Sequence, residues 1–167
     1  MGLLSFIKDA GEKLFHKGNA QAAMTAAQAD PASVEKSKAA NDAAGDAILS
    51  YINAQGLKAT GLTVTFDGAT SVATVFGIAD DQVSKEKIIL CCGNVAGVAS
   101  VNDQMTVDKS APEAKYYTVV SGDTLSKIAK TQYGDANKYP AIFEANKPML
   151  KSPDLIYPGQ MLRIPPL

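Results

Sequence analysis

Residues 117–130 have the sequence YTVVSGDTLSKIAK, and residues 155–165 have the sequence LIYPGQMLRIP. The first stretch begins with aromatic and β-branched residues, which favour a strand. It then breaks at residues 121–124, SGDT, whose side chains are typical helix caps. Leu125 and Ile128 follow at helical spacing, and the second stretch ends as a short apolar strand after a Pro-Gly turn. The two stretches therefore predict a strand and a helix at the start of one small domain and a strand at its end.

The residues between these stretches supply a second helix. Residues 133–137, YGDAN, contain a second set of capping side chains, and Ile142 and Phe143 line the helix expected after them. The resulting order is βααβ over residues 116–167. Both quoted stretches resemble the two ends of the LysM family pattern, in the same order, and the resemblance covers the whole module.

The LysM resemblance implies a ligand of N-acetylglucosamine polymer, such as peptidoglycan or chitin. It places the groove between the loop after the first strand and the loop before the last, where backbone groups can bond acetamido groups and apolar side chains can cover sugar faces. The alternative is that the first loop only caps a helix and the prolines of the second only set turns. The groove residues are Gly122, Asp123, Thr124 and Leu125 on one side and Pro153, Asp154, Leu155 and Ile156 on the other.

A second domain is predicted upstream, beginning with a helix. Asp30-Pro31 offers a cap followed by proline in the first turn, and Gly56 offers a stop. Ala44, Ile48 and Ile52 lie between them at helical spacing. Residues 16–42 are rich in Ala, Gln, Asn and Lys, and we expect them to be either disordered or part of a solvent-facing helix.

Strand signals follow this helix. Residues 62–66 alternate apolar residues with threonine, Asp67-Gly68 marks a turn, and residues 72–76 form the returning strand. A helix is expected from about Asp81 to Cys92, and a third strand from Gly97 to Val107. Together these predict an αββαβ order, which resembles the BON domain family. The stretch between Gly68 and Gly77 is longer than the usual hairpin return of that family, so we expect a bulge or wider turn there.

The predicted fold class is therefore α+β, with two small domains. The expected divisions are an N-terminal segment with an Ala-rich insert at 1–42, a BON domain at 43–108, a polar linker at 109–115 and a LysM domain at 116–167. Residues 1–15 are expected to pack as a helical or turn-like face through Leu4, Ile7, Leu14 and Phe15.

Composition and charge argue against several classes of function. The formal net charge is −1 and the basic residues are scattered, so the chain lacks the basic surface that nucleic acid requires. His16 is the single histidine, no cysteine–histidine cluster has zinc spacing, and no phosphate-binding loop is present. We therefore expect a binding protein rather than an enzyme.

Cys91 and Cys92 are adjacent, which favours two small buried helix residues over a disulfide.

The N-terminus predicts a cytoplasmic location. Its apolar run stops at Lys8-Asp9, too early for a secretory signal, and Phe6 stands where a myristoylation pattern needs Ser or Thr. No stretch approaches the roughly 20 apolar residues of a membrane span, so none is expected.

The order BON then LysM resembles a family of small bacterial cytoplasmic potassium-binding proteins of the BON–LysM type. The resemblance also covers FIKDAGEKLF at 6–15, GNVAGVASVNDQ at 93–104 and ANKPMLKSPDLIYPGQMLRIP at 145–165, and the Ala-rich insert departs from it. It implies a protein that senses or buffers K+. The alternatives are an envelope protein that binds peptidoglycan through LysM, and an adaptor that binds a protein partner through LysM or BON.

Two glycine-punctuated turns are the candidate potassium site. Neutral carbonyl oxygens replace the water shell of K+ without favouring divalent ions, and glycine lets the backbone curl and expose its oxygens. With the family resemblance, we expect about six main-chain carbonyls, and K+ binding should compact the protein. The alternative is that Gly93 only ends a helix, Gly97 only starts a strand and the N-terminus only packs. The carbonyls are those of Ile7, Ala10 and Glu12 in the first turn and of Gly93, Val95 and Val98 in the second.

Overall fold

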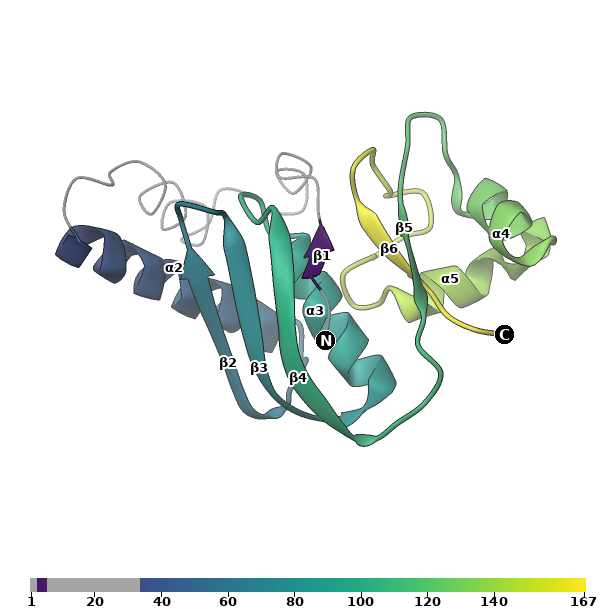
Figure 1. Cartoon of the computed structure of the whole chain (residues 1–167). Helices are drawn as coiled ribbons and strands as arrows, with labels where there is room; N and C mark the ends of the chain where they lie inside the picture. The colour runs from purple at the N-terminus through teal and green to yellow at the C-terminus, as the bar shows by residue number, and fades with distance from the viewer. Residues whose placement is uncertain (1–2, 6–33) are drawn as a thin grey trace.

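A computed structural model describes residues 3–5 and 34–167, which form two domains placed side by side (Figure 1). The N-terminal domain contains a four-stranded sheet of order β1-β4-β3-β2. Its helices, α2 and α3, both lie on one face of that sheet (Figure 1). The elements are β1 at Leu3–Ser5, α2 at Val34–Ala54, β2 at Thr60–Asp67, β3 at Val72–Asp81, α3 at Gln82–Gly93 and β4 at Ser100–Lys109.

The β2–β3 hairpin is antiparallel, as its turn signal predicts. The Asp67 carboxylate accepts hydrogen bonds from the Ala69 amide and the Thr70 hydroxyl, and the Asn41 side chain accepts one from the Gly68 amide. Of the expected bulge or wider turn between Gly68 and Gly77, the wider turn is found: four residues, 68–71, connect the strands, and pairing is regular from Asp67 to Thr63. A register shift lies at the other end of β2, between Thr60 and Thr63, opposite Gly77. Strand β3 continues past Phe76 to Asp81, paired with β4.

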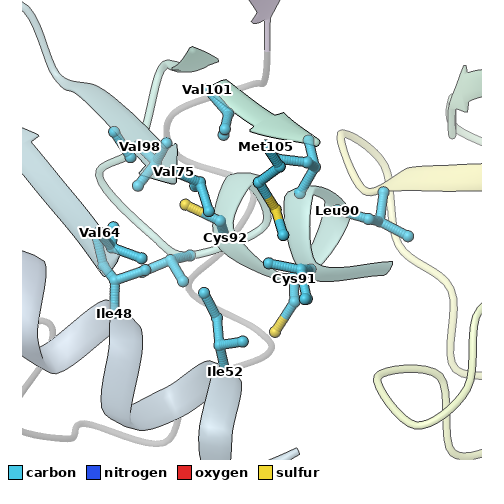
Figure 2. Packing of buried hydrophobic residues seen from close by; sticks show 14 of the residues in the cluster. Ile48, Ile52, Val64, Val75, Leu90, Cys91, Cys92, Val98, Val101 and Met105 are labelled. Atoms are coloured by element: carbon cyan, nitrogen blue, oxygen red, sulfur yellow. The ribbon is translucent and has the colours of Figure 1, made fainter. Parts of the chain in front are cut away.

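The helix α3 crosses from β3 to the parallel strand β4. The Asp81 side chain caps its first turn by accepting the Ser84 amide at 2.7 Å, and this bond lowers the pKa of Asp81. Cys91 and Cys92 are fully buried, and burial raises the pKa of the Cys91 thiol to about 12. Figure 2 shows both among the apolar side chains that fill the space between α2, α3 and the sheet. They are apolar core residues, as predicted.

Two local predictions for this domain are wrong. Leu4 lies in strand β1, paired with Val101 of β4, and not on a helical or turn-like face. Residues 97–99 belong to the turn before β4 and not to a strand, because Gly97 adopts a φ of +93° that breaks the extended backbone. Ile7, Leu14 and Phe15 lie outside the described residues, as do residues 16–33 of the insert, whereas residues 34–42 belong to α2.

The C-terminal domain has the predicted βααβ order, with a short 3-10 helix between its two α-helices. A left-handed Gly134 ends α4, and Asp135 caps the 3-10 helix. Val119, Leu125, Ile128, Ile142 and Leu162 are buried in its separate core. The elements are β5 at Lys115–Thr118, α4 at Leu125–Tyr133, η2 at Ala136–Lys138, α5 at Tyr139–Ala145 and β6 at Met161–Ile164.

Candidate functional site

The turn of residues 93–98 (GNVAGV), here the α3–β4 turn, connects the end of α3 to the sheet. The amides of Asn94 and Val95 close the helix, since Asn94 N–H donates to the Leu90 carbonyl at 3.1 Å and Val95 N–H to the Cys92 carbonyl at 3.2 Å. Val98 N–H then donates to the Val95 carbonyl at 3.1 Å, which closes a tight turn around Gly97. Gly93, Val95 and Val98, the three carbonyl donors predicted in this part of the chain, therefore lie within one compact, buried turn.

These hydrogen bonds fix where the carbonyls point. In a trans peptide the carbonyl is directed opposite to the following N–H. The Gly93 carbonyl is therefore directed away from α3, beyond its C-terminal end, because Asn94 N–H points back at Leu90. Ala99 N–H donates to Ser71 at 2.8 Å, on the β3 side of β4, so the Val98 carbonyl points toward the opposite side, where β1 lies. The Val95 carbonyl accepts one bond and keeps a second lone pair.

Strand β1 ends beside the start of β4, close to this turn. Ser5 pairs with Ser100 at the start of β4, two residues after Val98. The chain that leaves β1 toward the first predicted turn therefore departs from the same end of the sheet. Ile7, Ala10 and Glu12 themselves lie outside the described residues, so the structure shows one half of the predicted carbonyl set.

The chemistry of the α3–β4 turn suits a monovalent cation. The C-terminal end of a helix carries partial negative charge from its unpaired carbonyls, which favours a nearby cation. Within the described ranges 3–5 and 34–167, no group of three or more His, Cys, Asp or Glu side chains is placed to hold a metal. The oxygens offered at the turn are neutral carbonyls, which fit K+ better than a divalent ion.

Six of the eight predicted glycan residues line a separate cavity of about 370 Å³ in the C-terminal domain. Leu125 lies on one side, and Pro153, Asp154 and Ile156 lie on the other. Two further residues, Ser126 and Tyr139, line it, and Tyr139 was missed because it belongs to α5, between the two quoted stretches. Gly122 and Leu155 do not line the cavity, and Leu155 is 62% exposed.

Asp123 and Thr124 line this cavity while also fixing the local fold. The Thr124 hydroxyl accepts the Lys127 amide at the start of α4. Asp123 accepts the Val120 amide and the Tyr117 hydroxyl, and the latter bond raises the pKa of Tyr117. Thr124 thus has the capping role that the sequence offered as the alternative to glycan binding, whereas the Asp123 carboxylate holds the loop to the end of β5 rather than capping the helix.

The two domains meet at polar contacts that the sequence did not reveal. The Asn94 side chain, in the α3–β4 turn, donates to the Met161 carbonyl at 3.0 Å and accepts the Met161 amide at 3.1 Å. Buried Glu86 of α3 accepts Arg163 Nε at 2.6 Å, and its other oxygen accepts Gln82 Nε2 and the Ala114 amide, both at 2.9 Å. The sequence around a single Asn or Glu does not indicate which distant residue it will contact. Met161 lies 67 positions from Asn94, and Arg163 lies 77 positions from Glu86.

Comparison with known proteins agrees with this architecture. The BON domain family matches residues 40–109, and the LysM domain family matches residues 117–165. A protein named potassium binding protein Kbp, from Escherichia coli O6:H1 strain CFT073, is 45% identical over 165 residues, covering 99% of each chain. The chain belongs to this BON–LysM family. Its N-terminal domain is thus a BON domain and its C-terminal domain a LysM domain.

Shorter similarities involve other proteins. An uncharacterized protein of Deinococcus radiodurans is 55% identical over 49 residues, which are 29% of this chain and 19% of that protein. Esterase Rv1288 of Mycobacterium tuberculosis is 47% identical over 53 residues, which are 32% of this chain and 11% of the esterase. In the described part of the BON–LysM chain, none of the helices has the length and apolar character needed to cross a membrane.

Proposed function

We propose that the chain is a K+-binding protein that holds the ion by main-chain carbonyls. The observation that carries the proposal is the 45% identity, along 99% of both chains, to a protein named for potassium binding. The α3–β4 turn supports it, because Gly93 and Val98 direct carbonyls away from the α3 helix and away from β3. The same turn lies at the end of α3 where a cation is electrostatically favoured.

The proposed site takes about six oxygens from two turns, a number common for such cations. The α3–β4 turn supplies the carbonyls of Gly93, Val95 and Val98, and the N-terminal segment supplies those of Ile7, Ala10 and Glu12. Glu12 acts through its backbone, so the set is uncharged. Neutral oxygens favour K+ over divalent ions, because they offer less to compensate the loss of a tightly held water shell.

Ion binding would join the N-terminal segment to the BON domain. A ligand shifts a population toward the state it binds better, so K+ would favour the compact form. A protein with that response, placed in the cytoplasm, would act as a potassium sensor or buffer and would signal through a protein partner rather than catalyse a reaction.

Melting curves and hydrodynamic radius in matched salts test the proposal. KCl should raise the melting temperature and reduce the radius relative to equal NaCl, because only K+ fits the carbonyl set. Deleting residues 1–12 should abolish the K+ effect, since half of the oxygens would be lost. Identical melting curves in the two salts would refute K+ binding, and a full K+ effect in the deletion variant would place the site elsewhere.

The second candidate function is glycan binding at the LysM cavity. Its specific support is the 370 Å³ cavity, which brings residues of both predicted loops together with Tyr139. Under this candidate, purified peptidoglycan should retain the protein, the Tyr139→Ala variant should lose retention, and fractionation should place the protein in the envelope. Val120→Ala is the matched control, because Val120 is exposed and lies outside the cavity lining. Equal retention of the two variants would argue against the groove.

A further inference from the structure

Strand β6 of the LysM domain is bonded along one edge by two asparagine side chains. Its other edge pairs with β5. Asn146, within the LysM domain, bonds both the amide and the carbonyl of Arg163 at 2.8 Å. Asn94, from the BON domain, bonds both the amide and the carbonyl of Met161. Each asparagine side chain thus makes the two hydrogen bonds that a residue of a neighbouring strand would make. One of these asparagines, Asn94, belongs to the BON domain.

Asn94 is also part of the α3–β4 turn. Its N–H shares a peptide plane with the Gly93 carbonyl, and its carbonyl is only one residue from that of Val95. The side chain is 7% exposed and is held at both ends by Met161, so the torsions of residue 94 are tied to the position of β6. Freeing that side chain would remove one restraint on the torsions of residue 94 and leave only the backbone bonds to Leu90 and Cys92 to hold the start of the turn.

Other contacts show that the LysM domain is docked on the BON domain. Met149 and Met161 of the LysM domain belong to the hydrophobic core of the BON domain. Arg163 and Glu86 form a buried ion pair across the boundary, with side chains 4% and 5% exposed. One contact is unfavourable: the Tyr157 hydroxyl is buried and, among the described residues, has no hydrogen-bond partner. Burial raises the pKa of Tyr157, and the Tyr51 phenol of α2 adds to this shift.

We infer that Asn94 couples LysM docking to the ion affinity of the α3–β4 turn. The docked LysM domain holds the turn in the conformation whose carbonyls bind the ion. The turn then loses less conformational entropy when the ion binds, and the affinity for the ion is higher. By thermodynamic linkage, ion binding raises the equilibrium constant for LysM docking by the same factor by which docking raises the affinity for the ion. This inference rests on the proposed K+ site and assigns the LysM domain a role within it that needs no glycan.

Calorimetric titration with KCl tests the coupling, using the full chain and the variants Asn94→Ala and Asn53→Ala. Loss of the Asn94 bonds should weaken K+ binding about tenfold, equivalent to about 1.4 kcal/mol. Asn53 is exposed on α2, so Asn53→Ala should bind as the unaltered chain does. Amide hydrogen exchange reports docking in the same samples. Met161 N–H should lose protection in Asn94→Ala, while Arg163 N–H, bonded by Asn146, should keep it.

Two further variants separate docking from a direct effect on the turn. Arg163→Met weakens docking without touching the turn and should also lower K+ affinity several-fold. Tyr157→Phe removes the unpartnered hydroxyl, strengthens docking and should raise K+ affinity several-fold. Unchanged affinity in Arg163→Met, with Met161 N–H unprotected, would overturn the coupling. Absence of any K+ heat in the unaltered chain would instead overturn the proposed function.

Discussion

The Glu86–Arg163 ion pair should dominate the stability of the docked form. Both side chains are at least 95% buried, and Arg163 Nε lies 2.6 Å from Glu86 Oε2. Replacing Arg163 by methionine keeps much of the apolar volume but leaves a carboxylate buried without its counter-charge. Removing one partner of a buried pair typically costs about 3–5 kcal/mol. We therefore expect Arg163→Met to lower the free energy of unfolding by about that amount.

The double variant Glu86→Gln/Arg163→Met should recover most of the loss. A glutamine oxygen at position 86 can still accept both the Gln82 side chain and the Ala114 amide, because it has two lone pairs. Neutral replacements of a buried ion pair are often close to neutral in stability. Urea unfolding followed by circular dichroism gives the free energies if the transition is two-state. A loss below about 1 kcal/mol for Arg163→Met, or equal losses in the single and double variants, would refute this account of the interface.

Two further predictions concern the BON domain itself. Gly45→Ala should cost about 1–3 kcal/mol, since a Cβ there would lie 2.6 Å from the Val64 carbonyl oxygen, whereas Asp46→Ala on the exposed side should cost little in the same urea assay. The pKa of Asp81 is lower in the folded than in the unfolded protein, so its contribution to stability is present above about pH 4 and is lost as pH falls further. Asp81→Asn should therefore lose less stability than the unaltered chain between pH 7 and pH 3; equal losses would contradict the capping argument.

The sequence predicted those parts of the fold that depend on local signals. The DG turn at residues 67–68 placed the hairpin, Asp81 and Gly93 bounded α3, and the final strand lies, as predicted, at the end of the 155–165 stretch, over residues 161–164. The strand β1 was missed because three residues carry no periodicity that separates a strand from a helix. Its strand character comes from pairing with β4, far away in sequence.

The candidate site was predictable only in part, for the same physical reason. Glycine spacing and family resemblance together indicated the α3–β4 turn, and the structure places Gly93, Val95 and Val98 in it. The directions of the carbonyls depend on hydrogen bonds to Leu90 and Ser71, the second of which is a tertiary contact. Asn94 was quoted only as part of the turn, because its role depends on Met161 in the other domain.

Carbonyl ¹³C chemical shifts, followed by NMR during parallel KCl and NaCl titrations of the full chain, test the central claim most directly. Binding through main-chain oxygens predicts saturable K+-dependent shifts at the carbonyls of Gly93, Val95 and Val98, with no comparable change in NaCl. The LysM cavity residues, such as Tyr139 and Pro153, should shift far less. Unchanged carbonyl shifts across the α3–β4 turn under saturating K+ would contradict the account.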